Sequence, residues 1–238
     1  MNHSLIIALD FPDKQKVLNF LTPFDNEKLF LKVGMELFYQ EGPGIMYDLK
    51  SLGHKVFLDI KLHDIPNTVK NAMKGLARLN CDLVNVHAAG GVEMMAGALE
   101  GLEQGTPLGQ DRPLCIGVTQ LTSTSEEQMQ SEQLIHTSLQ ESVLHYASLT
   151  KKAGLDGVVC SPFEARHIRE QIGASFLTVT PGIRLTTDDN QDQKRAATPE
   201  FARDEGVSAI VVGRSITKAK DSVAAYHQIN QLWKGEGA

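Results

Sequence analysis

Short apolar runs rich in β-branched residues recur along the whole chain, each bounded by turn residues and followed by a segment with helical periodicity. Because these runs are continuously apolar rather than alternating, we expect strands covered on both faces, as in a parallel sheet wrapped in helices. Eight runs are predicted to form strands, at residues 5–10, 29–34, 55–61, 83–87, 114–121, 157–161, 176–182 and 209–213.

The segments between the predicted strands have the spacing of amphipathic helices. They cover residues 13–21, 44–52, 68–79, 92–102, 133–153, 162–171, 198–204 and 215–232. Three glycines (Gly53, Gly154 and Gly173) follow such segments, and Pro162 and Pro199 stand near the start of two, as is typical of helix ends. Eight strand–helix units in 238 residues have the size of a (β/α)8 TIM barrel, which we predict in preference to a doubly wound open sheet.

The composition is that of an ordinary globular protein, with 42% hydrophobic and 22% charged residues. No linker-like stretch divides it, so a single domain over residues 1–238 is expected. The net charge of −6 disfavours non-specific binding to nucleic acid or to an anionic membrane, although it allows a small basic pocket for one phosphate. No apolar run is long enough to cross a bilayer.

The three cysteines, Cys81, Cys115 and Cys160, are widely separated, and no histidine stands at zinc-ligand spacing from any of them. We interpret them as small buried hydrophobic residues. The apolar run at residues 5–9 is too short for the core of a secretory signal and stops at Asp10, so a cytoplasmic location is expected.

Charged residues interrupt or end the first three predicted strands, although isolated buried charge is costly unless it is paired or functional. Asp10 ends the first strand and Lys32 lies within the second. Asp59 and Lys61, two residues apart on the third, point to the same face, and Asp64 follows them. In a barrel, the carboxyl ends of these strands would place two acids and two bases around one mouth.

Salt bridges that merely close the barrel are the alternative, and each residue taken alone favours that interpretation. The group as a whole favours a site, because alternating charges keep the lysines protonated and the aspartates ionised where negative charge must move. By contrast, we interpret His63 as a packing residue or part of a subunit contact. We interpret His87 as a barrel-lining residue hydrogen-bonded to a neighbour, and Asn85 as part of a polar network.

A second polar region follows the last two predicted strands. Gly213-Arg214-Ser215 closes the eighth strand and opens a helix, where free N–H groups favour an anion. The polar stretch at residues 183–197 follows the seventh strand and is either a plain surface loop or a lid over the site. We favour the lid, because the stretch follows Pro181-Gly182 and holds two arginines near the usual phosphate site of barrels.

The segment at residues 59–68, DIKLHDIPNT, resembles the DxKxxDIPNT signature of the orotidine 5'-monophosphate decarboxylases. The resemblance continues with ALDF at 8–11, KVG at 32–34, LTS at 121–123, PGIR at 181–184, DQKR at 192–195 and VVGRSI at 211–216. It implies a TIM-barrel enzyme that decarboxylates a pyrimidine nucleotide to UMP, the last step of its synthesis, without metal or organic cofactor.

The resemblance also implies roles for the matching residues. Lys61 would donate a proton to C6 of the pyrimidine, flanked by Asp59 and Asp64, with Lys32 completing the array. Asp64 and Thr68 would reach the neighbouring subunit's site, which implies a homodimer. The other implied substrate contacts are Asp10 and Lys32 at the ribose, Thr122 and Ser123 at the base edge, Pro181 beside the base, Arg184, Gln193, Gly213 and Arg214 at the phosphate, and Ile65 and Asn67 within the signature.

Two other functions stay open. A 3-keto-gulonate-6-phosphate decarboxylase shares the DxKxxD pattern but uses Mg²⁺, held by a glutamate where this chain has Lys32, and a cation there opposes a divalent metal. A nucleotide-binding barrel without catalytic activity would be expected to have lost a charged member of the array, and none is replaced. Tight UMP binding without turnover would identify that second alternative.

Overall fold

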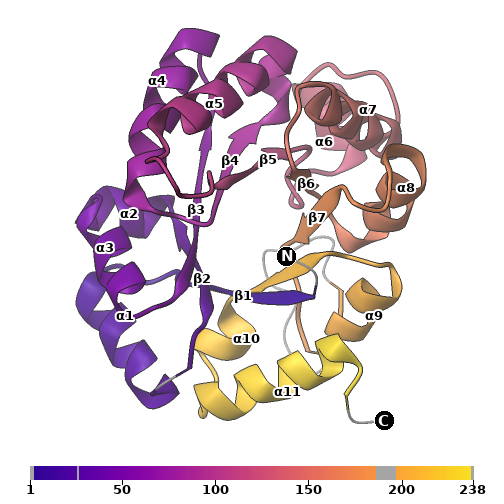
Figure 1. Cartoon of the computed structure of the whole chain (residues 1–238). Coiled ribbons are helices and arrows are strands. Elements are labelled where there is room, and N and C mark those ends of the chain that lie inside the picture. The colour runs from indigo at the N-terminus through magenta and orange to yellow at the C-terminus, as the bar shows by residue number, and fades with distance from the viewer. Residues whose placement is uncertain (1–2, 26, 186–196, 237–238) are drawn as a thin grey trace.

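Eight parallel strands form a closed barrel in the computed structural model, which describes residues 3–25, 27–185 and 197–236 (Figure 1). The strands are β1 (Ser4–Ala8), β2 (Phe30–Gly34), β3 (Lys55–Leu62), β4 (Leu83–His87), β5 (Leu114–Val118), β6 (Gly157–Val159), β7 (Leu177–Thr180) and β8 (Ala209–Val212). Each strand pairs with the next along the chain, and β8 pairs with β1 to close the barrel. The predicted (β/α)8 barrel is therefore confirmed, and the open sheet is excluded.

The side chains of each strand alternate between the barrel interior and the surrounding helices. In β1, Ile6 and Ala8 belong to the interior cluster, whereas Leu5 and Ile7 pack with residues of the outer helices. The buried members of the interior cluster are Ile6, Ala8, Phe57, Leu83, Ile116, Val179, Ala209 and Val211. Burial on both faces is the physical reason for the continuous apolar runs in the sequence.

The helices form the outer ring in Figure 1. They are α1 (Lys14–Leu21), α2 (Met35–Glu41), α3 (Gly44–Ser51), α4 (Pro66–Leu76), α5 (Gly91–Gly105), α6 (Glu126–Glu132), α7 (Leu139–Lys152), α8 (Pro162–Ile172), α9 (Pro199–Asp204), α10 (Arg214–Thr217) and α11 (Ser222–Lys234), with 3-10 turns η1 (Thr22–Phe24), η2 (Ala77–Leu79) and η3 (Ala88–Gly90). Pro162 and Pro199 occupy the first positions of α8 and α9, as predicted. Gly53, Gly154 and Gly173 have positive φ just beyond α3, α7 and α8, which glycine adopts without strain.

Several helices differ from the prediction. The helix expected at 133–153 begins only at Leu139, because the Ser138 hydroxyl accepts the Glu141 N–H and the two residues form a capping box. The helix expected at 215–232 is divided into α10 and α11, and Asp221 caps the second by accepting the Ala224 N–H. Helix α2 follows β2 directly without a side-chain cap, so no local signal marked it.

Several strands end earlier at the carboxyl side than predicted. β5 ends at Val118 rather than at residue 121, and β1 ends at Ala8, so Asp10 lies just beyond the strand. The chain leaves the sheet at these points and continues into the loops around the barrel mouth. Some residues that were expected at the ends of strands therefore lie at the start of the following loops.

The polar loop after β7 has its two ends joined by backbone hydrogen bonds. The Arg184 N–H donates to the Ala197 carbonyl at 3.0 Å, and the Ala197 N–H donates to the Gly182 carbonyl at 3.3 Å. Residues 186–196 lie outside the described part of the chain, so the expected lid stays a prediction.

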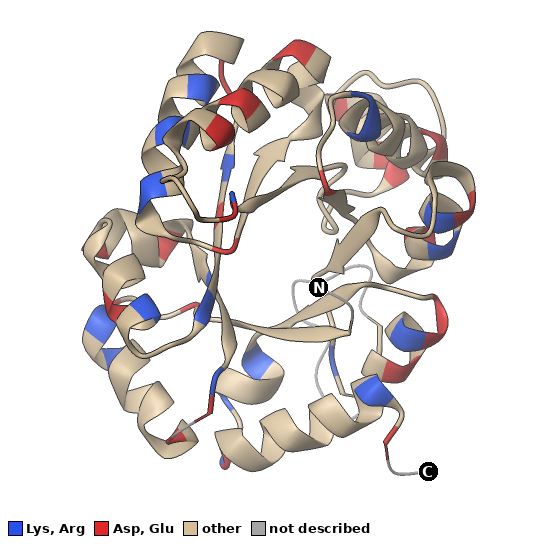
Figure 2. Ribbon diagram, viewed as in Figure 1, with Lys and Arg blue, Asp and Glu red and all other residues tan. Residues whose placement is uncertain are grey.

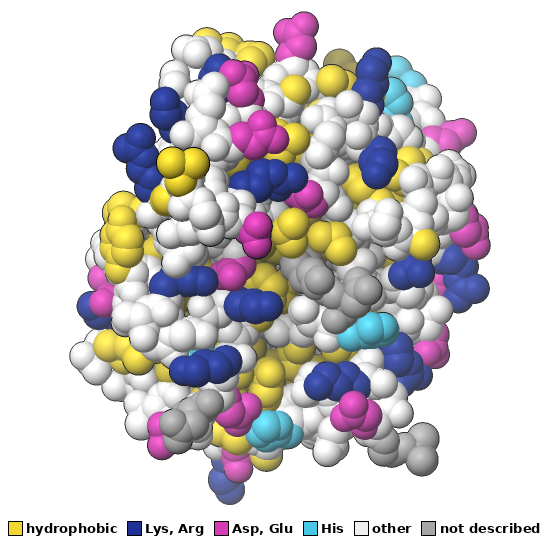
Figure 3. Space-filling model, viewed as in Figure 1, with side chains coloured by type: hydrophobic (Ala, Val, Ile, Leu, Met, Phe, Trp, Pro, Cys, Tyr) yellow, Lys and Arg dark blue, Asp and Glu magenta, His cyan; other side chains and the backbone are white. Residues whose placement is uncertain are grey.

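Most charged residues lie on the outer helices, and only a few lie on the strands (Figure 2). Anionic and cationic side chains are interspersed over the face drawn in Figure 3. Within the described ranges, no helix has both the length and the apolar character needed to cross a membrane.

Candidate active site

A cavity of about 580 Å³ lies at the carboxyl ends of the barrel strands. Its floor is apolar, because Ala8, Phe57, Val179 and Val211 belong both to its lining and to the interior cluster of the barrel. Polar and charged side chains from the strand ends and the following loops form its walls. The cavity therefore has an apolar floor and polar groups that converge on its interior, as small-molecule sites commonly do.

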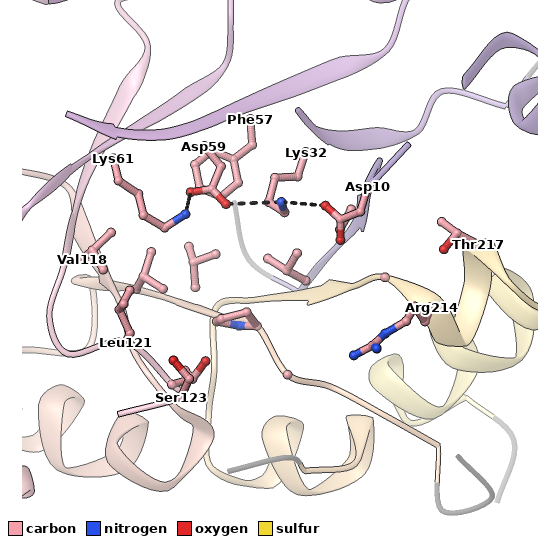
Figure 4. Close-up of a pocket in the computed structure, with 18 of the residues that line it drawn as sticks. Asp10, Lys32, Phe57, Asp59, Lys61, Val118, Leu121, Ser123, Arg214 and Thr217 are labelled. Carbon is pink, nitrogen blue, oxygen red and sulfur yellow. Dashed lines mark hydrogen bonds and ion pairs between the residues drawn. The ribbon is translucent and has the colours of Figure 1, made fainter. Parts of the chain in front are cut away.

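Four charged side chains, from β2, β3 and the loop just after β1, form a continuous row along one wall of the cavity (Figure 4). Lys61 Nζ lies 2.7 Å from Asp59 Oδ1, and Lys32 Nζ lies 3.3 Å from Asp59 Oδ2. Lys32 Nζ also lies 3.4 Å from Asp10 Oδ1. The order base, acid, base, acid is the one expected from the sequence.

Strand alternation directs three of these side chains inward. Lys32 lies between the buried residues Leu31 and Val33 of β2, which face the helices. Asp59 and Lys61 share the inner face of β3, although β3 is irregular there: its pairing with β4 shifts register between Leu58 and Leu62, and Lys61 has φ of 49°. A positive φ is costly for a lysine and occurs mainly where function or surrounding structure holds it.

Asp59 is nearly surrounded by hydrogen-bond donors. Burial by itself would raise its pKa, but the charges of Lys32 and Lys61 oppose this, as do hydrogen bonds from the Lys61 ammonium and the Asn85 amide. Their combined effect outweighs burial and holds the pKa of Asp59 below its ordinary value. Asp59 is therefore ionised at neutral pH.

Among the described residues that line the cavity, cations outnumber anions, in contrast to the net charge of −6 of the chain. The anionic side chains in this described lining are Asp10 and Asp59. The cationic side chains in its lining are Lys32, Lys61, Arg184, Arg214 and Lys218. Such a cavity suits a ligand that carries more than one negative charge.

Three of these cations, Arg184, Arg214 and Lys218, come from the segments that follow β7 and β8. Gly213 also lines the cavity, and its missing side chain leaves space beside Asp10. Helix α10 has only four residues, so its dipole contributes less than the sequence suggested. Cationic side chains are the main source of positive potential at this end.

Thr122, Ser123 and Pro181 also line the cavity, as expected for residues near a ligand. Thr122 is buried, whereas Ser123 is exposed. Leu121, Gln120 and Lys218 are lining residues that sequence reasoning did not propose as ligand contacts. For Lys218 the available signal was its place four residues after Arg214, one helical turn on.

The second half of the predicted signature lies apart from this cavity. Asp64, Ile65, Asn67 and Thr68 are exposed and are absent from the cavity lining. The Asp64 carboxylate accepts the Ile65 N–H at 2.6 Å, and Ile65 is 66% exposed. These residues are therefore available to a neighbouring molecule. Gln193 lies outside the described residues.

Beyond the cavity wall, Asn85 on β4 contacts both Asp59 and Lys61, a pairing that sequence reasoning did not assign. The His63 and His87 rings lie beside each other, with centroids 5.5 Å apart. Burial lowers the pKa of His87, electrostatic interactions with His63 and Lys61 lower it further, and Asp59 opposes the change. The two rings therefore pack against each other, and membership of a polar network stays a prediction.

No group of three or more His, Cys, Asp or Glu side chains in the described ranges is placed to hold a metal ion. The expectation of a reaction without metal or organic cofactor stays a prediction.

A family model described as "Orotidine 5'-phosphate decarboxylase / HUMPS family" matches residues 3–229. Orotidine 5'-phosphate decarboxylases of Bacillus cereus (strain AH820) and Bacillus mycoides (strain KBAB4) are each 61% identical over 235 residues, 99% of both chains. The crystal structure of orotidine 5'-phosphate decarboxylase from Lactobacillus acidophilus is 44% identical, with TM-score 0.86 over 97% of this chain and 98% of that one. An uncharacterized conserved protein from Geobacillus kaustophilus is 56% identical, with TM-score 0.87 over 96% and 99%.

Proposed function

Because the chain belongs to the orotidine 5'-phosphate decarboxylase / HUMPS family, we propose that it removes CO2 from orotidine 5'-monophosphate and releases UMP. The observation that carries this proposal is the row Asp10, Lys32, Asp59 and Lys61 along a cavity whose remaining cations can hold a phosphate. The substrate carries a carboxylate and a phosphate, so its charge complements the positive cavity.

Arg184, Arg214 and Gly213, with Gln193 from the loop, are proposed to hold the phosphate, because the cations of this end lie in the segments after β7 and β8. Asp10 and Lys32 are proposed to hold the ribose hydroxyls. Thr122, Ser123 and Pro181 would border the base, which leaves C6 facing Lys61. Phosphate binding remote from C6 would help to hold the substrate in its reactive arrangement.

The chemical step breaks the bond from C6 to the carboxylate carbon. CO2 leaves, and the electron pair stays on C6, where no carbonyl is placed to accept it. The Lys61 ammonium stabilises this charge and then transfers a proton from Nζ to C6, which forms the C6–H bond of UMP. Asp59 orients the Lys61 ammonium by accepting its hydrogen bond at 2.7 Å. Solvent returns the proton to Lys61 after product release.

A homodimer completes the site in this proposal. The exposed segment with Asp64, Ile65, Asn67 and Thr68 would cross to the partner, where Asp64 joins the array beside the partner's lysine and Thr68 contacts its substrate. Exposure of Ile65 at 66% supports burial against another subunit. We place the enzyme in the cytoplasm, which its three free, buried cysteines support.

The test is the absorbance change of orotidine 5'-monophosphate on addition of purified protein with excess EDTA. We expect rapid conversion to UMP by the wild type and a loss of about 10⁴-fold in kcat for Lys61→Ala, which removes both the charge and the proton donor. Lys55→Ala, at the exposed amino end of the same strand, is the matched control and should retain activity.

Each other outcome points elsewhere. A folded wild type that binds UMP tightly but does not turn over would indicate the non-catalytic barrel. Metal-dependent turnover of a keto sugar phosphate would indicate the Mg²⁺ enzyme, against which Lys32 argues by placing its ammonium between Asp10 and Asp59.

A further inference from the structure

Asn85 lies in the middle of β4, where its neighbours Val84 and Val86 are apolar and buried, and only 1% of Asn85 is exposed. Its amide makes two contacts with β3. The Nδ2 group donates to Asp59 Oδ1 at 2.6 Å, and Oδ1 accepts the Lys61 N–H at 2.9 Å. A buried polar side chain is retained where its hydrogen bonds are made, and here both partners belong to the charged row.

The contact with Lys61 occurs where β3 and β4 lose their regular register. The Lys61 N–H bonds to the Asn85 side chain, and the Lys61 backbone adopts its positive φ at the same point. Asparagine suits this position, because one side of its amide donates and the other accepts, with a length that spans the two strands. The Lys61 ammonium and the Asn85 amide then meet on one oxygen, Asp59 Oδ1.

We infer that Asn85 is a positioning residue: it fixes the Asp59 carboxylate and the irregular backbone of Lys61, so that the Lys61 ammonium is aimed into the cavity. The inference rests on the function proposed above. Asn85 is absent from the cavity lining, so it acts through Asp59 and Lys61 and not on the substrate. Its loss is therefore expected to lower kcat more than it changes KM.

The hydrogen bond from Asn85 also favours the ionised form of Asp59. The other charged or titratable groups near Asp59 are Lys32 on β2 and Lys61 on β3, with Asp10 beyond Lys32 and His87 on β4. None of them replaces the donor that Asn85 supplies. Removing it raises the pKa of Asp59, so the acidic limb of the pH profile of kcat/KM should move to higher pH.

Two variants separate the two contacts. Asn85→Ala removes both. Asn85→Asp keeps the shape and the acceptor for the Lys61 N–H, but it directs a carboxylate at Asp59. Thr178→Val is the matched control, because Thr178 is also fully buried and accepts the Ser208 N–H at 3.1 Å, but it lies outside the cavity lining.

Turnover of orotidine 5'-monophosphate is measured for all four proteins across acidic pH, with thermal unfolding alongside. We expect Asn85→Ala to lose about 10- to 100-fold in kcat and to move the acidic limb upward, and Asn85→Asp to move it further because like charges repel. Thr178→Val should lose thermal stability and keep the wild-type pH profile.

An inactive wild type would refute the proposed function. An active wild type with unchanged kcat and an unchanged acidic limb in Asn85→Ala would refute the role of Asn85 alone. The same shift in Thr178→Val would show a general effect of destabilisation and would also refute it. If Asn85→Ala does not fold, the isosteric Asn85→Asp supplies the same readout.

Discussion

At the amino ends of the strands, two aspartates stand at the starts of β4 and β6. Asp82 accepts the Lys50 ammonium at 2.7 Å and the Val56 N–H at 2.8 Å. Asp156 forms a bidentate ion pair with the Arg112 guanidinium, with N···O distances of 2.7 and 2.9 Å. It also accepts a hydrogen bond from the Cys115 N–H at 2.7 Å. Each carboxylate is thus matched by one cation and tied to the backbone of the preceding strand.

At the carboxyl ends the balance is different. Asp59 has two lysines, and both of them also face the cavity. No backbone hydrogen bond to the Asp59 carboxylate occurs among the described residues; its other partner is the Asn85 amide. Both ends contain pairs of aspartate and cation, so the pairs alone do not identify a site. The open cavity does, because both lysines of Asp59 face it, whereas the pairs at the amino end are absent from its lining.

The largest effect is expected from Asp59→Asn, which tests whether Asp59 differs in role from the aspartates at the amino ends of the strands. The variant keeps the shape but removes the negative charge that pairs with the Lys61 ammonium and orients it, so kcat should fall by about 10³-fold. Steady-state kinetics with orotidine 5'-monophosphate measures the change. Activity close to that of the wild type would place Asp59 with the structural carboxylates of the amino end.

The opposite result is expected from Asp156→Asn. The variant weakens a two-pronged ion pair and a backbone hydrogen bond, which should lower the free energy of unfolding by about 2 kcal/mol, with kcat unchanged. Denaturant unfolding and kinetics on the same preparation measure both quantities. Asp111, which is exposed and precedes Arg112 in the chain, supplies the control. Asp111→Asn should change neither the free energy of unfolding nor kcat. A loss of kcat in folded Asp156→Asn would contradict a purely structural role.

The smallest expected effect concerns Lys218 and tests whether the cations that line the cavity attract the substrate. Lys218 is exposed at the cavity edge, so Lys218→Ala should raise KM by about three- to fivefold at low salt, and added salt should reduce the difference. Lys220→Ala removes an equal charge just outside the lining and serves as the control. Equal KM changes in both variants would show that only net charge matters, not the place of Lys218.

The sequence by itself determined the barrel, because eight apolar runs flanked by helical segments have one economical arrangement. It also determined the row of charges, since strand alternation and the shared direction of parallel strands fix where residues such as Lys32 and Asp59 point. The ends of helices were harder to predict. Helix α7 begins after the cap at Ser138, although the helical pattern of the sequence extends further towards the amino end.

Only the tertiary structure decided the contacts of Asn85 and the cavity-facing place of Lys218. Asn85 bonds to residues 24 and 26 positions away, through a register shift between β3 and β4 and a left-handed Lys61. Periodicity describes which face a residue occupies, but it does not give the register of two strands joined by a helix. The matched pairs at the amino end are decided in the same way, because Asp156 meets a residue 44 positions earlier in the chain.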